Sequence, residues 1–193
     1  MHELHTRRLL LREWRDADRE PFAAMSADAE VMRFLMPIAD SDAWIDRQRQ
    51  HQADHGICFW PAALAQSGEF IGSVGLVQVP YQTHYTPAVE VGWRLARGFW
   101  CRGYATEAAA AALRFGFERL GLREIVANTA VDNAASQRVM LRLGMSRDPA
   151  DDFDHPRVPL GHRLRRQVLY RLAADHWRTL QAGAGSGAPA ASL

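Results

Sequence analysis

The chain has 193 residues, 48% of them hydrophobic, and a formal net charge of +1 at pH 7. This length and composition predict one domain with a sizeable core, and the near-neutral charge argues against nucleic acid as a partner. No apolar run approaches the roughly 20 residues of a membrane span, and the first residues do not resemble a secretory signal, so we expect no membrane association. The two cysteines are too few for a disulfide framework, which indicates a cytoplasmic protein.

The first half of the chain predicts a mixture of strands and helices. In chain order we expect a strand over 6–14, a helical stretch containing Phe22, Met25 and Val31, a helix over 42–54, strands over 57–65 and 70–79, and a loop over 80–88. Asp40 can cap the second helix and Gly56 can end it, because these residue types favour the two helix termini. The sequence Gln-Ser-Gly-Glu at 66–69 is typical of a hairpin turn between two strands.

The second half continues the same mixture of elements. We expect a strand over 89–96, a helix over 105–120, a strand over 123–131, a short helix from the cap Asn133 to Gly144, a loop over 146–162 on the substrate side, and a last strand over 167–172. The whole order predicts a single α+β domain over 1–182. Residues 183–193 are Gly, Ala, Ser, Pro and a final Leu, which predicts a disordered tail.

The turn over 97–107 is the most informative segment, with the sequence Arg-Gly-Phe-Trp-Cys-Arg-Gly-Tyr-Ala-Thr-Glu. It joins a strand of period two to an alanine-rich helix, and the free N–H groups at a helix start favour an anion. Arg97 and Arg102 add positive charge, and Gly103 allows the backbone to approach a ligand closely. Neither the dinucleotide fingerprint nor the P-loop pattern occurs here, so a phosphate-binding turn and a plain tight turn both stay open at this point.

Several ordered motifs resemble the GNAT superfamily of acyl-CoA-dependent N-acyltransferases, and specifically its RimJ/RimL-like branch, which acetylates the N-terminal amine of ribosomal proteins. The similarity covers about residues 6–178. Its motifs are Thr6–Arg12, Trp100–Ala108, Phe117–Leu122, Asp132–Ser136, Leu143–Met145 and Gln167–Leu172.

The resemblance implies a single-domain GNAT fold. Its central sheet would be mixed, mostly antiparallel, of about seven strands, with helices on both faces and two central strands that splay apart. It implies acetyl-CoA as acyl donor, an amine as acceptor and no metal. The implied donor-binding residues are Val91, Trp93, Leu95, Arg97, Arg102, Gly103, Tyr104, Ala105, Thr106, Asn133 and Ser136.

The reaction requires a neutral amine, so a base must remove a proton from the acceptor. We predict Glu90 for this role, directly or through water, because it lies on the central strand opposite the Val89, Val91 and Trp93 face. A solvated or salt-bridged Glu90 is the competing interpretation. A backbone N–H near Trp93 would stabilise the oxyanion, and Ser136 is the hydroxyl best placed to assist the leaving thiolate.

Two positions depart from the family pattern. Trp100 and Cys101 replace a polar and a commonly small residue in the pyrophosphate signature, while its Gly103 and Ala105 are retained. Met140 stands where many members have a tyrosine that protonates the thiolate, and a thioether cannot donate a proton. A non-catalytic acyl-CoA sensor is therefore kept as an alternative, beside acetylation of a small-molecule amine such as an antibiotic or a polyamine.

Other polar groups have ordinary interpretations. His51 and His55 have helical i, i+4 spacing but lack a third metal ligand, so a solvated helix face is expected. The arginine clusters around Arg8 and Arg12 and at 163–166 are read as solvated strand faces. His84 contacts either the acceptor or solvent. The sequence leaves open whether the chain acts alone or as a homodimer.

Overall fold

The protein is described by a computed structural model that covers residues 3–185. One sheet of nine strands has the order β1-β2-β3-β4-β5-β6-β9-β7, and β8 pairs with β9. The strands are β1 (Leu4–His5), β2 (Leu9–Leu11), β3 (Phe59–Leu64), β4 (Phe70–Gln78), β5 (Val89–Leu95), β6 (Glu124–Ala130), β7 (Ser146–Arg147), β8 (Phe153–Asp154) and β9 (Arg166–Ala173). The α-helices are α1 (Arg19–Ala27), α2 (Ala29–Met32), α3 (Ser41–His55), α4 (Tyr104–Arg114), α5 (Ala134–Arg142) and α6 (Ala174–Gly185).

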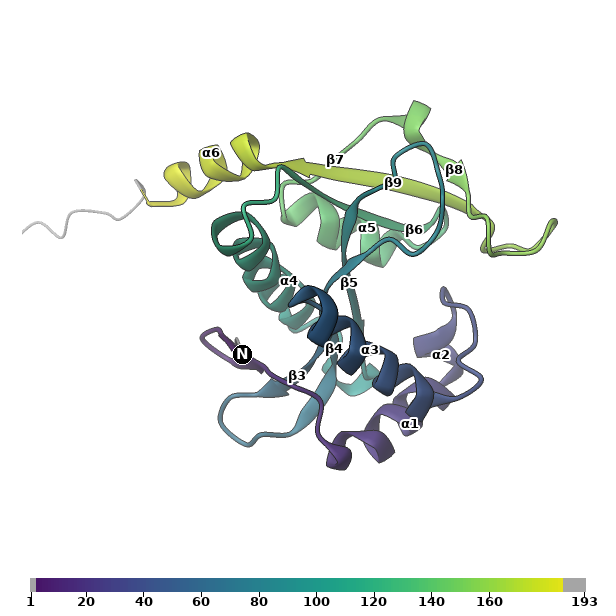
Figure 1. The fold of residues 1–193 in the computed structure, drawn as a ribbon, viewed down its shortest axis with the longest axis vertical. Helices are drawn as coiled ribbons and strands as arrows, with labels where there is room; N and C mark the ends of the chain where they lie inside the picture. The colour runs from purple at the N-terminus through teal and green to yellow at the C-terminus, as the bar shows by residue number, and fades with distance from the viewer. Residues whose placement is uncertain (1–2, 186–193) are drawn as a thin grey trace, which may run out of the picture.

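Helices cover both faces of the sheet (Figure 1). On β5, the side chains of Val91 and Leu95 are buried in the main core together with alanines of α4. The neighbouring Gly92 lies on the opposite face, under the ring of Phe59, which stacks against Trp44 of α3. Because successive side chains of β5 point to opposite faces of the sheet, α4 packs on one face of this strand and α1 with α3 on the other.

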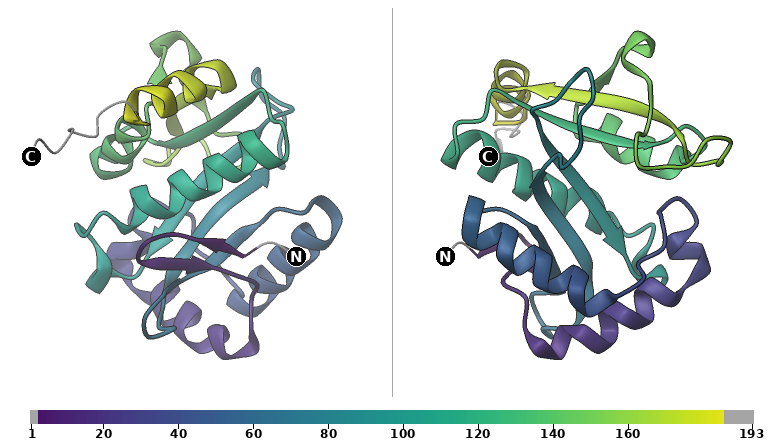
Figure 2. Two further views of the ribbon diagram at one scale, coloured as in Figure 1. Left: turned by 90° about the vertical axis from the view of Figure 1, so that its left-hand side faces the viewer. Right: turned by 45° about the vertical axis from the view of Figure 1, so that its right-hand side comes forward.

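The sheet is split in its middle. β5 pairs with β4 along its whole length, from Gly72↔Leu95 to Gln78↔Val89, and β6 pairs with β9 from Glu124↔Ala173 to Ala130↔Gln167. Between β5 and β6, which are parallel, Glu90↔Val126 is the single pair of the described residues. The two strands then diverge, and the right-hand view of Figure 2 shows the two halves of the sheet opening as a wedge.

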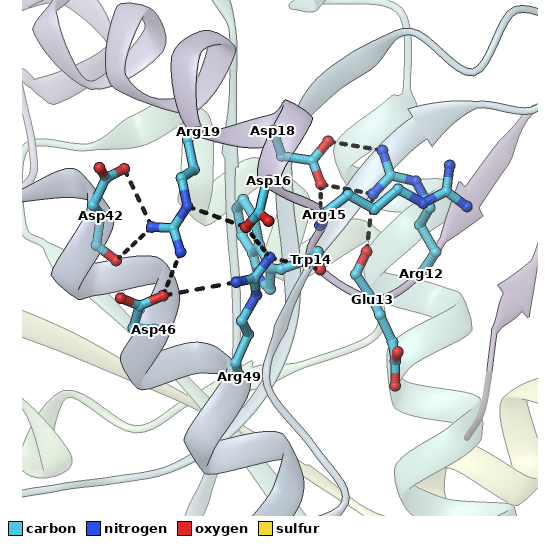
Figure 3. Close-up of polar contacts among 10 residues, drawn as sticks. All are labelled: Arg12, Glu13, Trp14, Arg15, Asp16, Asp18, Arg19, Asp42, Asp46 and Arg49. Atoms are coloured by element: carbon cyan, nitrogen blue, oxygen red, sulfur yellow. Dashed lines mark hydrogen bonds and ion pairs between the residues drawn. The ribbon is translucent and has the colours of Figure 1, made fainter.

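An ionic cluster anchors the start of the chain to α1 and α3 (Figure 3). Arg19 contacts Asp42 and Asp46 of α3, while Arg49 contacts Asp16. Arg12 and Asp18 form two hydrogen bonds of 2.7 and 2.8 Å in the interior. The interpretation of Arg12 as part of a solvated face is therefore wrong: the residue is only 5% exposed, because Asp18 neutralises it.

Several boundaries differ from those predicted. The sheet has nine strands rather than about seven. Six correspond to the strands expected along the chain, and the two-residue strands β1, β7 and β8 add to them. The strand expected over 6–14 is a short hairpin of β1 and β2, in which Leu4 pairs with Leu11. The helix expected to reach 120 changes after Arg114 to a π-helical turn, Phe115–Arg119.

The end of the chain and the segment before it also differ in part. The loop predicted over 146–162 contains β7, β8 and a 3₁₀ turn at Pro149–Asp151. Helix α6 extends to Gly185, so it occupies 183–185 of the expected tail. The remainder of that tail lies outside the described residues. Among residues 3–185, no helix combines the length and the apolar character needed to cross a membrane.

Candidate active site

The turn before α4 has the geometry of an anion site. Gly103 is the residue before the helix and has φ +79°, in the left-handed region that favours glycine. Within the described structure, no side chain caps this helix start. The N–H groups of Tyr104, Ala105 and Thr106 therefore lack the intrahelical partners that later residues have. Those groups, with the positive end of the helix dipole, can bind a phosphate.

Arg8, which sequence reasoning assigned to a solvated face, holds this turn in place. Its guanidinium donates to the carbonyl of Arg102 at 3.0 Å and lies 4.5 Å from the ring centre of Tyr104. It also forms an ion pair of 2.6 Å with Glu107 in the first turn of α4. Burial would raise the pKa of Glu107, but hydrogen bonds from Thr6 and Arg8 outweigh it and lower that pKa. The pair therefore stays ionised and fixes the turn to the first hairpin.

The remaining predicted residues of the turn have varied surroundings. Arg102 is exposed, with its guanidinium 5.7 Å from the ring centre of Phe99. Arg97 is also exposed and lies 3.6 Å from Asp28. The indole of Trp100 donates to the carbonyl of Leu95 at 2.7 Å, so this carbonyl of β5 already has a partner. Trp100 therefore has a structural role here.

On the α4 side of the wedge, β5 and α5 are linked across the gap. The indole N–H of Trp93 donates to the hydroxyl of Ser136 at 3.3 Å. Asn133 accepts from the N–H of Ser136, as the predicted helix cap, and donates to the hydroxyls of Ser136 and Thr129 at 3.1 and 2.9 Å. Since Ser136 Oγ accepts two hydrogen bonds, its own proton is available to another acceptor.

On the opposite side of the wedge, Glu90 is half-buried at the single β5–β6 pair. Burial raises the pKa of Glu90 to about 7, and a hydrogen bond of 2.9 Å from Asn128 opposes this rise. Asn128 also donates to the hydroxyl of Tyr81, which lies 3.0 Å from that of Tyr85. A carboxyl group with this pKa is ionised about half the time at neutral pH, which suits a general base.

Asn128, which donates to Glu90, is a site residue that was not predicted from the sequence. The sequence feature that could have indicated Asn128 is a polar amide in a strand of otherwise apolar residues. Its neighbours Val126, Ala127 and Ala130 are apolar and buried. Burial, followed by the charge of Glu90, raises the pKa of Tyr81 far above its ordinary value, so this phenol stays protonated. Tyr81 and Tyr85 come from the loop predicted between β4 and β5, whereas His84 of the same loop contacts Asp151 at 3.4 Å.

Other candidates lie away from the wedge. Met140 is 2% exposed and packs in the main core. His51 accepts a hydrogen bond from the backbone of Gln78, and residues 3–185 contain no group of three side chains that could hold a metal. A pocket of about 520 Å³ lies between the π-helical turn and α6, at the end of α4 opposite Gly103.

The split sheet, the uncapped start of α4 and the polar groups on both sides of the gap define the architecture of an acyl-CoA-dependent acyltransferase. The model of the acetyltransferase (GNAT) domain family matches residues 8–146, and the chain belongs to this family. It is therefore an N-acetyltransferase, and the GNAT fold uses acetyl-CoA as donor. The residues fit this donor, because the turn at Gly103 offers N–H groups to a pyrophosphate. Beyond Glu90 the β6-facing edge of β5 also has no strand partner among the described residues, and of its carbonyls that of Leu95 is bound to Trp100.

Known proteins agree with this assignment. The chain is 31% identical over 192 residues to the FsC-acetyl coenzyme A-N(2)-transacetylase of Aspergillus fumigatus, covering 92% of this chain and 79% of the relative. An acetyltransferase from Agrobacterium tumefaciens has the same fold with a TM-score of 0.73 and 27% identity, covering 89% of this chain and 94% of that one. The ribosomal-protein-S5-alanine acetyltransferase of Vibrio fischeri shares the fold at a TM-score of 0.72 and 15% identity, covering 92% and 99% of the two chains.

Proposed function

We propose that the enzyme transfers the acetyl group of acetyl-CoA directly to a primary amine, with Glu90 as the base. The observation that carries this proposal is the position of Glu90, half-buried at the point where β5 and β6 separate, with a pKa raised by burial to about 7. A base at this point can take the proton of an ammonium group that enters from the α1 and α3 side. No side chain is required as a covalent nucleophile, because an amine attacks a thioester without help from one.

The donor would be held by two groups of residues. The N–H groups of Tyr104, Ala105 and Thr106, with Gly103 and the charges of Arg97 and Arg102, would bind the pyrophosphate. The unpaired main chain of β5 from Val91 towards Leu95 would bind the pantetheine arm. When bound, acetyl-CoA supplies the acetyl group as an activated thioester.

The amine must lose a proton before it attacks, and the thiolate must be stabilised as it leaves. Glu90 accepts the proton from the amine, and Asn128 fixes the orientation of the Glu90 carboxylate by its 2.9 Å hydrogen bond. Ser136 can donate a hydrogen bond to the leaving thiolate, because Trp93 and Asn133 already donate to its oxygen and leave its hydroxyl hydrogen free. A thiol has a pKa of about 8.5, so the thiolate can leave with this hydrogen bond and take its proton from water.

For the acceptor we propose the α-amine of a protein N-terminus, as in the RimJ/RimL-like branch. An α-amine has a pKa of about 7.7 to 8.0, which a base of pKa about 7 can deprotonate with a small loss of driving force. The fold shared with a ribosomal-protein acetyltransferase supports this acceptor class. The fold is also shared with a spermidine N-acetyltransferase of Vibrio cholerae, at a TM-score of 0.70 and 17% identity, which supports a small-molecule amine as second candidate.

Release of free coenzyme A thiol from acetyl-CoA, measured with a panel of amines, tests the function. We expect thiol release with peptides that carry a free N-terminus and none with the same peptides after N-terminal blocking. Release with small amines but not with peptides would select the second candidate. Tight acetyl-CoA binding without release across the panel would reject acetyl transfer and leave a sensor.

A further inference from the structure

Arg94 of β5 carries a charge that the fold does not pair. Its Nε and Nη1 atoms are buried without a hydrogen-bond partner, and among the described residues its charge has no acidic partner. The residue is half-buried, so the guanidinium lies at the edge of the interior. Burial lowers the pKa of Arg94 to about 10, which still leaves the group charged at neutral pH. Buried charges in proteins are normally paired. The described part of the chain supplies no partner for Arg94, so a ligand would have to supply it.

Aromatic rings surround the cation but cannot replace an anion. The guanidinium carbon lies 5.7 Å from the ring centre of Phe22 in α1 and 5.6 Å from that of Trp44 in α3. These two rings stack on each other with centres 4.6 Å apart. Ring faces attract a cation but accept no full hydrogen bond from its N–H groups. Ser26, one helical turn after Phe22, also has a buried hydroxyl without a partner.

Arg94 shares its face of β5 with Glu90. The two residues are four apart, so the period of two puts both on the side of α1 and α3, at a Cα separation of about 13 Å. Gly92 lies between them, and a Cβ atom there would approach the ring of Phe59 to 2.8 Å. The ring of Phe59 covers this stretch, so an acceptor with its amine at Glu90 and a second group near Arg94 would pass over that ring.

The wall around Arg94 is fixed. Arg19 of α1 contacts Asp42 and Asp46 of α3, and Arg49 of α3 contacts Asp16 before α1 (Figure 3). These contacts hold the two helices that carry Phe22 and Trp44 against each other. A ligand therefore reaches the buried Nε and Nη1 atoms of Arg94 only when these rings shift, whereas Nη2 is not among the buried unpaired atoms.

We propose that Arg94 is a specificity residue that binds an anionic group, a carboxylate, carried by the amine acceptor several bonds from its amine. This inference rests on the acetyl transfer to an amine proposed above. The carboxylate would accept two hydrogen bonds from the planar guanidinium, as arginine pairs with carboxylates elsewhere. Both a small amino acid and a peptide with an acidic side chain near its N-terminus carry this chemistry.

The test compares matched acceptors that differ in charge alone. Calorimetry on the protein loaded with coenzyme A would use linear ω-amino acids of two to six carbons and their methyl esters. A second arm would use blocked-C-terminus peptides with Glu or Gln at the second or third residue. We expect the charged member of one arm to bind wild type at least ten times more tightly than its neutral counterpart. The arm that shows this preference identifies the source of the carboxylate.

Arg94→Met, of similar length, is expected to remove that preference, weakening the charged probe about 10- to 100-fold and leaving the neutral one unchanged. Arg7→Met makes the same charge change at an exposed position and is expected to change neither. The unfolding temperature of Arg94→Met should equal or exceed that of wild type, since the variant loses a buried charge without a partner. A large drop would indicate a structural role and contradict the proposal, as would equal binding of charged and neutral probes to wild type.

The two proposals fail separately. Acetylation of amines without any carboxylate preference, in rate or in binding, would reject the role of Arg94 and keep acetyl transfer. Binding of the charged probes that depends on Arg94, with no acetylation of any amine, would reject acetyl transfer and keep the anion site. Arg94→Lys gives a further check, because it retains the charge but cannot form the two parallel hydrogen bonds.

Discussion

At the scale of single residues, β5 separates the chemistry of the site by its alternation. Trp93 faces α5, where it donates to Ser136, while Glu90 and Arg94 face α1 and α3. Both charged groups have pKa values shifted by burial, upward for Glu90 and downward for Arg94. Each shift brings the group closer to its neutral form, which is the expected effect of a low-dielectric environment.

Replacing Glu90 by Gln should affect rate and stability in opposite ways. Turnover above pH 7 is expected to fall about 100-fold, and the decline in rate as the pH drops through about 7 should disappear. The pKa of Glu90 is higher in the folded than in the unfolded protein, so ionisation of Glu90 lowers the free energy of unfolding. This loss of stability is absent below the pKa of the unfolded state and grows as the pH rises towards 7. The variant should therefore unfold at a higher temperature than wild type at pH 8 and not at pH 4. An unchanged pH–rate profile would remove Glu90 from the mechanism.

A substitution of Asn128 tests the role of the Glu90 carboxylate indirectly, because Asn128 donates a hydrogen bond to it. The hydrogen bond from Asn128 lowers the pKa of Glu90 against the effect of burial, so Asn128→Ala should raise that pKa further. The acidic limb of the pH–rate profile is then expected to move to higher pH, with no change in acetyl-CoA affinity. Tyr81→Phe removes the other acceptor of the Asn128 amide and serves as the matched control, with a smaller shift expected. A limb that moves equally in both variants would contradict the assignment.

At the scale of elements, the turn before α4 depends on one backbone conformation. Gly103 has φ +79°, and a Cβ atom added there would lie 3.4 Å from its nearest neighbour, Nη2 of Arg8. There is therefore enough space for a side chain at position 103, and the left-handed backbone conformation is the reason why glycine is favoured there. In the left-handed region another residue costs about 1–2 kcal/mol, which the turn can relieve only by moving its N–H groups.

Gly103→Val should accordingly weaken acetyl-CoA binding about 10-fold and leave the rest of the fold intact, as measured by calorimetry and circular dichroism. Gly98→Ala is the matched control in the same segment, because no atom lies within 4 Å of its added Cβ. It is expected to retain wild-type affinity. Equal affinity of both variants would refute the phosphate-binding turn.

The ionic cluster beside α1 allows a prediction about stability. Asp18 and Arg12 have side chains 4% and 6% exposed, so Asp18→Ala leaves a buried arginine unpaired and should cost about 3–5 kcal/mol of unfolding free energy. Asp16, two residues earlier, has a side chain 82% exposed, and Asp16→Ala should cost less than about 1 kcal/mol. Urea denaturation of both variants measures the difference, and similar costs would mean that burial does not govern this cluster.

At the scale of the whole molecule, the enzyme consists of two half-sheets joined at one strand pair. Helix α4 and the contact of Trp93 with Ser136 link the halves on one side, and Glu90 with Asn128 on the other. The gap between the halves is thus lined by both sets of polar groups. A donor on the α4 side and an acceptor on the α1 side can meet in it.

Hydrogen exchange with and without acetyl-CoA checks this arrangement. We expect slower exchange on binding at amides of 91–95 and 102–106, because the first group lies along the open edge of β5 and the second starts α4. Amides of β2 and β3, which pair with each other away from the gap, provide the internal control and should not change. Protection centred instead on the pocket beside α6 would move the donor site there.

The comparison of prediction with structure separates local from non-local information. The α+β class and most element positions followed from periodicity and helix caps, which are local, and the split sheet followed from the resemblance to the GNAT superfamily. The environments of Arg8 and Arg12 could not be predicted in this way, because each arginine pairs with an acid that only the folded chain brings beside it. Glu107 lies 99 residues from Arg8, and Asp18 lies six residues from Arg12, across a bend. The short strands at the edges of the sheet were missed, since two residues carry no readable period.

The acyl donor could be inferred from the order of residues alone, because the turn around Gly103, its flanking strand and helix, and the motifs up to Gly144 are contiguous features that one family shares. The surroundings of Glu90 and Arg94 required the folded chain, because the residues that bury, orient or leave them unpaired come from β6, α1 and α3. Electrostatic environment is a property of atoms close in space, and residues 22, 44, 94 and 128 come together only when the chain folds.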